Sequence, residues 1–189
     1  MTTMAKSSKE AAAAASNEKL LDAAVHVIRS KGYSAARVED ICAEAGLTKG
    51  AFFHHFASKE ACAVAAAAHF AANADALFDA APYTRLHDPR DRVLGYIDFR
   101  KAILQGELPQ FTCLLGTMVQ EAYDTHPAIR AACDRYIGEH ARPLLRVLHH
   151  SREGHVGRAL PRLEQRLEVA KQLPLPIAVG DVGIAGIVQ

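Results

Sequence analysis

The feature that most constrains this chain is the segment of residues 38–60, which predicts two short helices joined by a tight turn. The first helix is expected over residues 38–45. Gly46 follows it, and glycine ends helices readily because it adopts the left-handed conformation without a Cβ penalty. Thr48 can cap the second helix, which is expected over residues 49–56. A helix, a glycine-containing turn and a second helix is the sequence form of a DNA-reading helix-turn-helix.

The same segment resembles the N-terminal domain of TetR-type transcriptional regulators, whose usual pattern is Thr-Val-x-Asp-Ile-Ala-x-x-Ala-Gly-Val-Ser-x-Gly-x-Leu-Tyr-x-His-Phe-x-x-Lys-Glu. The positions that keep this pattern are Val38, Asp40, Ile41, Ala45, Gly46, Gly50, His55, Phe56, Lys59 and Glu60. Arg37 replaces the threonine that usually starts the first helix, and Phe53 replaces a tyrosine that usually donates its hydroxyl to a phosphate. Arg37 can add a phosphate contact of its own, whereas Phe53 can only pack or contact a thymine methyl.

The resemblance implies a ligand-responsive regulator of transcription. We expect a repressor that binds a palindromic double-stranded DNA operator as a homodimer and is released by a small-molecule effector of unknown identity. The alternative is a helical DNA-binding-like protein whose dimer interface is disrupted, so that it binds an operator weakly or not at all.

The fold class expected is all-α, because no convincing strand alternation appears before residue 174. We expect a mobile tail over residues 1–15, a helix-turn-helix domain over 16–62 and a helical regulatory and dimerisation domain over 63–189. A first amphipathic helix is predicted over 17–31 from its apolar spacing. The resemblance implies that a long helix over 59–80 links the two domains and sets the distance between the reading heads of a dimer.

The regulatory domain is predicted to contain helices over residues 91–105 and 110–124 and a further helix that ends near residue 150. Residues 151–189 are atypical for the family, because Pro174 and Pro176 interrupt them and the end is rich in glycine and β-branched residues. This composition is the reason for the alternative of a disrupted dimer interface.

The charge, hydropathy and cysteine content of the chain limit the classes of function that it can have. The formal net charge is +1, and residues 16–60 carry as many acids as bases, so phosphate attraction alone gives weak DNA binding and favours a dimer. The chain has no run of about 18 apolar residues, so we expect no membrane span. The cysteines are widely spaced, which fits a reducing cytoplasm. Without a phosphate loop, a nucleophile motif or a metal-ligand run, we expect neither an enzyme nor a cofactor or metal.

The expected reading helix supplies most of the candidate DNA contacts. Lys49 lies at its amino end, where residues reach the groove, and lysine can donate to guanine or to phosphate. Gly50 permits close approach of the backbone, and Thr48 and Lys59 are expected to hold phosphates. His54 faces outward and is either a reader of base edges or a solvated side chain. The DNA-binding candidates are Arg37, Thr48, Lys49, Gly50, Phe53, His54 and Lys59.

An effector pocket is expected among the helices of the regulatory domain. Apolar and aromatic side chains would line it, with Tyr96 and Thr117 as polar groups that orient a ligand. The ligand-binding candidates are Tyr96, Phe99, Ile103, Phe111, Cys113, Thr117, Met118 and Tyr123.

Cys113 admits two interpretations. No basic residue lies beside it in the sequence, so we interpret it first as a buried structural thiol. A thiol sensor that acts through Cys113 stays open as a variant of the regulator.

Overall fold

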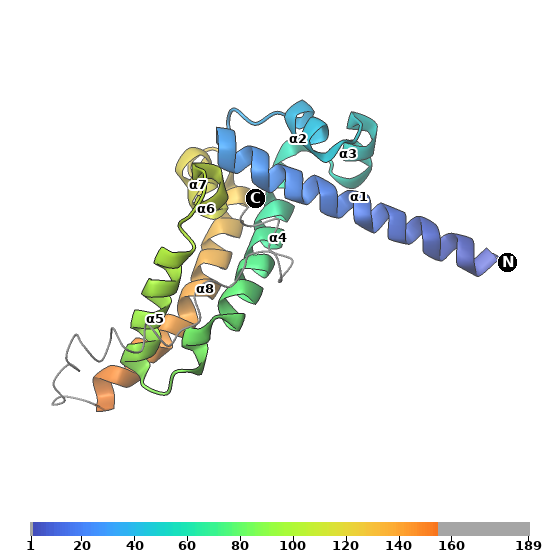
Figure 1. Cartoon of the computed structure of the whole chain (residues 1–189). Helices are drawn as coiled ribbons and strands as arrows, with labels where there is room; N and C mark the ends of the chain where they lie inside the picture. Colours follow the sequence, from blue (N-terminus) through green and yellow to red (C-terminus); the bar gives the residue numbers. More distant parts are fainter. Residues whose placement is uncertain (1, 155–189) are drawn as a thin grey trace.

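The computed structural model describes residues 2–154. Within that range every regular element is helical (Figure 1), which confirms the all-α class. The elements are α1 (Thr2–Lys31), α2 (Val38–Ala45), α3 (Lys49–His55), α4 (Lys59–Ala80), the 3₁₀ helix η1 (Pro82–Arg85), α5 (Pro89–Ala102), α6 (Leu108–Phe111), α7 (Leu114–Ala122) and α8 (Pro127–Gly154).

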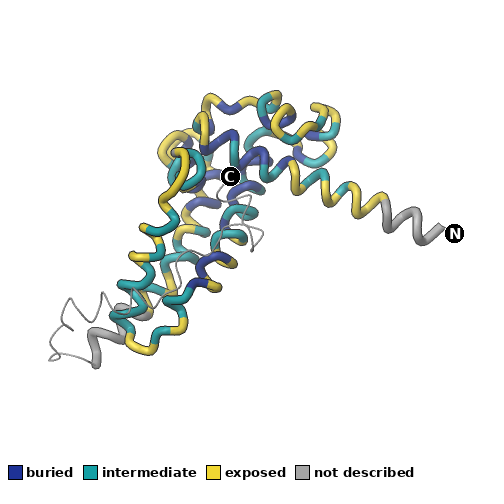
Figure 2. The backbone as a smooth tube through the Cα atoms, in the orientation of Figure 1, coloured by how far each residue is buried: buried dark blue, intermediate teal, exposed yellow. Residues whose placement is uncertain are grey.

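The N-terminal head consists of α1, α2, α3 and the start of α4, which enclose an apolar core. Leu20 and Ile28 of α1, Ile41 of α2 and Phe52 of α3 are each at most 1% exposed. Figure 2 shows the buried positions where these helices meet. The apolar spacing of the first helix and the two short helices after it therefore form one packed unit, as their sequence periodicity predicted.

The first helix is longer than expected. The sequence predicted it from residue 17 and assigned residues 1–15 to a mobile tail, but α1 is continuous from Thr2. Its amino half projects away from the head (Figure 1). The alanine run at residues 11–15 accounts for the difference, because alanine has the highest helix propensity and needs no tertiary contact to prefer the helix.

The linking helix α4 joins the head to the body. By its length and its apolar, alanine-rich composition alone, α4 could cross a membrane. It instead packs against both α1 and α8, and it buries Cys62, Ala66, Leu77 and Phe78 among other side chains. These contacts are those of a core helix that runs through both parts of the protein.

The body is formed by α4, α5, α7 and α8, which pack against one another (Figure 1). The sequence predicted a single helix over residues 110–124, but the chain forms α6 and α7 with a break at Thr112 and Cys113. A tertiary contact accompanies the break, since the Thr112 carbonyl accepts a hydrogen bond of 2.7 Å from Nε of Arg29 on α1. A β-branched residue such as threonine also has low helix propensity.

The last helix, α8, runs from Pro127 to Gly154 with Pro143 inside it. It extends slightly beyond the end predicted near residue 150. The segment 155–189, which contains most of the stretch judged atypical from its composition, lies outside the described residues.

Candidate functional site

Caps at both ends of the turn position the reading helix α3. Gly46 ends α2 with a left-handed φ of 64°, which a side-chain-bearing residue adopts only with strain. Thr48 caps α3, where its hydroxyl oxygen accepts a hydrogen bond of 3.2 Å from the Ala51 amide. Both features agree with the sequence prediction. The turn therefore fixes the direction of α3 relative to α2 through local chemistry.

Opposite faces of α3 have opposite environments. Phe52 is fully buried, and it contacts the rings of Phe53 and Phe56 at centroid distances of 5.3 and 5.5 Å. Phe53 itself is 56% exposed. Thr48, Lys49, Gly50 and His54 are exposed as well, on the side of α3 that faces away from Phe52. Five of the seven DNA-binding candidates thus lie together on one solvent-facing surface, which we call the α3 face.

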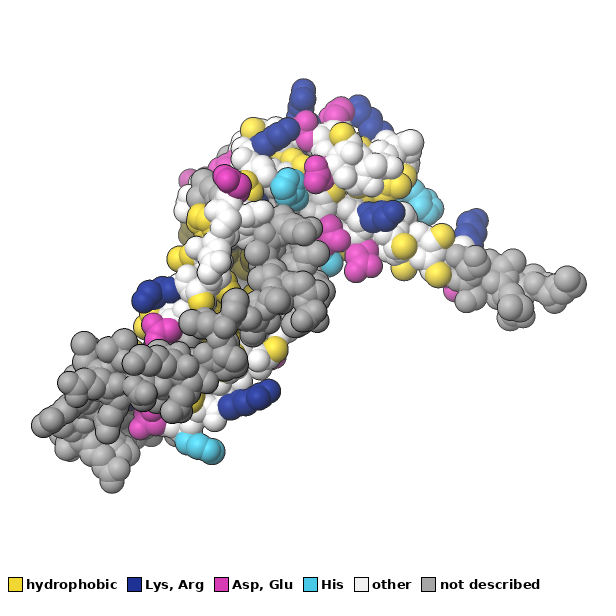
Figure 3. All heavy atoms as spheres, viewed as in Figure 1, with side chains coloured by type: hydrophobic (Ala, Val, Ile, Leu, Met, Phe, Trp, Pro, Cys, Tyr) yellow, Lys and Arg dark blue, Asp and Glu magenta, His cyan; other side chains and the backbone are white. Residues whose placement is uncertain are grey.

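Acidic side chains of α2 pair with the basic residues near the α3 face. Lys49 forms an ion pair with Glu39, and its ammonium lowers the pKa of that carboxyl. Figure 3 shows basic and acidic side chains interspersed at this end of the molecule. Lys49 is therefore already engaged by an acid, although both side chains are about half exposed. An exposed pair of this kind is weak and can be exchanged for a phosphate.

Arg37 precedes α2 and forms hydrogen bonds to its first turn. Its amide and guanidinium both donate to Asp40, at 3.0 and 3.4 Å. The Arg37 amide, the Arg37 guanidinium and Lys31 lower the pKa of Asp40 from 3.8 to about 2. The carboxylate therefore stabilises the head at pH above 3.8, and this contribution is lost as the pH falls through about 2. Arg37 serves as a helix-start residue in place of threonine.

Lys59 has a structural environment that differs from the expected phosphate contact. Its ammonium donates to the carbonyls of Tyr33 and Ala36, both at 3.0 Å, and lies 4.3 Å from the centre of the Tyr33 ring. These bonds tie the start of α4 to the loop between α1 and α2. Two of its three donors are occupied, so Lys59 holds the head together, and any phosphate contact has one donor left.

We expect Lys59→Met to destabilise the head by about 1–3 kcal/mol, because it leaves two carbonyls without their charged donor. Urea denaturation followed by circular dichroism measures the change. Lys49→Met is the matched control, since that exposed side chain bonds no carbonyl, and it should change stability by less than about 0.5 kcal/mol. Equal stability of both variants would show that Lys59 has no such structural role.

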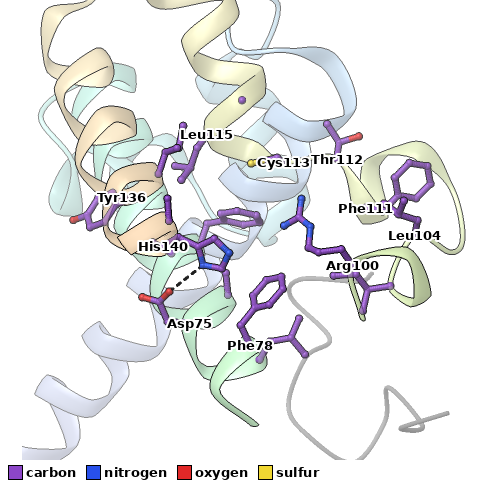
Figure 4. Close-up of a pocket in the computed structure, with 18 of the residues that line it drawn as sticks. Asp75, Phe78, Arg100, Leu104, Phe111, Thr112, Cys113, Leu115, Tyr136 and His140 are labelled. Carbon is purple, nitrogen blue, oxygen red and sulfur yellow. Dashed lines mark ion pairs between the residues drawn. The ribbon is translucent and has the colours of Figure 1, made fainter. Parts of the chain in front are cut away.

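A second candidate site is a cavity of about 390 Å³ in the body, at the junction with α1. Its walls come from α1, α4, α5, α8 and the α6–α7 segment, and Figure 4 shows their side chains converging. The lining is mainly apolar. The lining residues include Arg29, Phe70, Ala71, Asp75, Phe78, Tyr96, Arg100, Ile103, Leu104, Phe111, Cys113, Leu115, Ile137 and His140.

The structure brings four of the eight ligand-binding candidates to this cavity, namely Tyr96, Ile103, Phe111 and Cys113. The other four lie outside its lining. Met118 is fully buried in the core shared with the head. Phe99 packs on Phe78 and Tyr83, the Thr117 hydroxyl donates to the Cys113 carbonyl, and Tyr123 is 55% exposed with Arg130 over its ring.

Cys113 is exposed, which corrects the interpretation of a buried thiol. It lines the cavity together with Arg29, and an electrostatic interaction joins the two residues. The other cysteines are buried, and burial raises the pKa of Cys62 to about 12 and that of Cys133 to about 11. Among the four thiols, Cys113 is therefore the accessible one.

Arg29 is one of several cavity residues that were not predicted from the sequence. It is 6% exposed, its guanidinium lies 5.7 Å from the centre of the Phe70 ring, and burial lowers its pKa. A signal was present in the sequence, because Arg29 lies four residues after Val25 and therefore on the buried side of α1. A charged residue in an apolar stripe indicates a specific partner.

Three side chains from different helices form a polar cluster on the cavity wall. Nδ1 of His140 lies 3.6 Å from the Asp75 carboxylate, and its Nε2 lies 3.2 Å from the Tyr96 hydroxyl. The dashed line in Figure 4 marks the pair of His140 and Asp75. The His140 ring therefore lies between the Asp75 carboxylate, at ion-pair distance, and the Tyr96 hydroxyl, at hydrogen-bond distance. Among the described residues, no cluster of three or more His, Cys, Asp or Glu side chains is placed to hold a metal ion.

The head and the body are joined close to the cavity. The Ser34 amide donates to the Glu121 carboxylate at 2.7 Å, and the rings of Tyr33 and His126 meet edge to face at 5.0 Å. Together with the bond from Arg29 to Thr112, these contacts connect the α1–α2 corner of the head to α7 and to the start of α8. A change of shape in the cavity can therefore reach the head through α1 as well as through α4.

Comparison with known proteins places the head in a known class. Residues 20–66 match the sequence model for bacterial regulatory proteins of the tetR family. An uncharacterized HTH-type transcriptional regulator, YerO of Bacillus subtilis (strain 168), is 34% identical over 53 residues. That segment is 28% of this chain and 18% of YerO, so the chain matches less than a fifth of that relative's length.

Solved structures extend the likeness to the body. Escherichia coli NemR in its reduced form has a TM-score of 0.62 and 26% identity, over 82% of this chain and 80% of NemR. TetR-family regulators from Agrobacterium tumefaciens and Chloroflexus aurantiacus have TM-scores of 0.65 and 0.66 at 19% and 22% identity. They cover 84% and 85% of this chain and 83% and 81% of their own. At those identities, the two show the fold alone.

The matched family model, YerO and the two TetR-family structures are all named as regulators, in agreement with the expectation that the chain is not an enzyme. The matched head contains the helix-turn-helix, and the similarity of fold continues through the cavity-bearing body. The chain therefore carries a helix-turn-helix head of the tetR-family type, and its fold is that of TetR-family regulators of transcription.

Proposed function

We propose that this protein is a dimeric repressor that binds a palindromic operator and is released by a small molecule in the body cavity. The observation that carries the proposal is the α3 face, where Lys49, Gly50 and His54 are exposed on a helix whose opposite side is anchored in the core. A rigid helix that presents a polar face at its amino end fits the major groove.

Dimerisation follows from the charge of the head. The acids and bases of residues 16–60 balance, and Lys49 already pairs with Glu39. One head has little net attraction for phosphates, so tight binding requires two heads on one operator, where the second binds at high effective concentration. A palindromic operator matches the two-fold symmetry of such a dimer.

Release by a ligand is supported by the walls of the cavity. Phe70 and Phe78 belong to α4, which continues into the head, and Arg29 belongs to α1. A ligand that prefers one arrangement of these helices shifts the protein toward it, and so changes the spacing and orientation of the heads. The coupling requires that the ligand contact α1 and α4 differently in the two arrangements.

The experiment that tests this function combines mass and DNA binding. Light scattering after size exclusion should give a mass near twice 20.4 kDa. An operator selected by the wild-type protein from random duplexes should be palindromic, and its affinity should fall steeply as salt is raised. A monomeric mass with no selected sequence would favour the alternative of a disrupted dimer interface.

A thiol-sensing variant has a specific observation in its favour, since Cys113 is exposed in the cavity beside Arg29. Alkylation by iodoacetamide joins the sulfur to carbon and releases iodide and a proton, which fills part of the cavity. We expect it to lower operator affinity in the wild-type protein and not in Cys113→Ser, as measured by fluorescence anisotropy of labelled operator. Loss of affinity in both proteins would assign the effect to another thiol.

A further inference from the structure

The charges of the body cavity indicate the chemical class of its ligand. The cavity is lined mainly by apolar side chains, with the rings of Phe70 and Phe78 on the α4 wall. The formally charged side chains among its lining residues are Arg29, Arg100 and Asp75. Two cations and one anion around an apolar space give a net positive site, and a wall of low polarizability strengthens its field.

The single acid among the lining residues, Asp75, lies beside a polar partner on the cavity wall. Asp75 pairs with Nδ1 of His140, and His140 is held from its other side by the Tyr96 hydroxyl. Asp75 thus has a neighbour on the wall itself, and the two arginines of the lining outnumber it.

Arg100 provides the positive group that a ligand can reach. Its guanidinium carbon lies 5.5 Å from the centre of the Phe78 ring, and Figure 4 shows the side chain directed from α5 toward the cavity. Among the side chains that the structure describes, no carboxylate forms an ion pair with Arg100. Its neighbour Lys101 is the residue that pairs, with Asp98 at 3.7 Å.

The position of Arg100 also sets the orientation of a ligand. Arg100, Leu104 and Ile137 are exposed at the rim, whereas Phe78, Leu115 and Ala71 are buried deeper in the lining. An apolar body that enters first would leave a charged end at the rim. The planar guanidinium fork matches a carboxylate, which it binds through two parallel hydrogen bonds.

We propose that the effector is a small monocarboxylate with an aromatic or branched apolar body, whose carboxylate binds Arg100 while the body fills the cavity. The inference rests on the proposed function, because it assigns a ligand class to the effector site. A cavity of about 390 Å³ lies within the range for small-molecule sites.

The test uses para-substituted benzoates, from benzoate to 4-tert-butylbenzoate, each with its neutral benzamide. Calorimetry on the full-length protein measures affinity. We expect each benzoate to bind roughly 10- to 100-fold more tightly than its amide, because a charge-assisted bond to Arg100 is lost in the amide. Arg100→Met should remove this preference. Lys101→Met, on the same helix but outside the cavity lining, should retain it.

Equal affinity of acids and amides, a preference that persists in Arg100→Met, or no binding by any benzoate at millimolar concentration would overturn the inference. Circular dichroism and the thermal midpoint check that both variants fold. Operator release, measured separately, distinguishes the two levels of the proposal. Benzoates that bind through Arg100 without releasing DNA would support the proposed ligand class and contradict the proposed ligand-released repressor. Release of DNA by neutral amides alone would support the ligand-released repressor and contradict the proposed ligand class.

Discussion

Phe52→Ala is expected to destabilise the head by about 3–5 kcal/mol, the range for removing a large aromatic side chain from a close-packed core. Phe52 is fully buried, and its ring packs against those of Phe53 and Phe56. The loss comprises the free energy of burying the ring and the cost of the cavity left behind. Because domains are only marginally stable, most of the stability of the head would be lost.

Urea denaturation followed by circular dichroism measures this change, with Phe53→Ala as the matched control. Phe53 is adjacent in sequence but 56% exposed, so its replacement should change stability by less than about 0.5 kcal/mol. The two variants separate the roles of the two faces of α3. Similar losses in both would mean that Phe53 is packed against other residues in solution and that the α3 face is not free.

Lys49→Ala is expected to weaken operator binding by about 1–3 kcal/mol per half-site, and therefore by about 2–6 kcal/mol for a dimer on two half-sites. Lys49 is the exposed base at the amino end of α3. If it contacts a phosphate, the loss should be similar for all sequences and the salt dependence should become shallower. If it contacts guanine, one position of the operator should lose its preference.

Glu39→Gln provides the opposite change at the same place. It removes the acid that pairs with Lys49 in the unbound protein, so binding to DNA no longer has to break that pair. We expect higher affinity and a steeper salt dependence. Lys101→Ala is the control, since it removes the same charge from α5. Anisotropy titrations at several salt concentrations measure all three variants, and an unchanged affinity in both Lys49→Ala and Glu39→Gln would exclude this end of α3 from the interface.

The helix-turn-helix is the part of the protein that its sequence determined. The helix end at Gly46 and the caps at Thr48 and Ser58 depend on residues within a few positions of one another. The buried positions of Leu20, Ile41 and their neighbours follow from helical periodicity. Caps and apolar spacing can be recognised in the sequence without knowledge of tertiary contacts. The predicted bounds of the two short helices and of the start of α4 were accurate for this reason.

The lining of the cavity and the contacts between the head and the body depend on tertiary structure. The bond from Arg29 to the Thr112 carbonyl spans 83 residues of sequence, and it accompanies the break between α6 and α7 and the exposure of Cys113. The bonds of Lys59 to the α1–α2 loop span 26 and 23 residues. Periodicity gives the side of a helix that is buried but not its partner, so a core residue such as Met118 and a cavity residue such as Phe111 look alike in sequence.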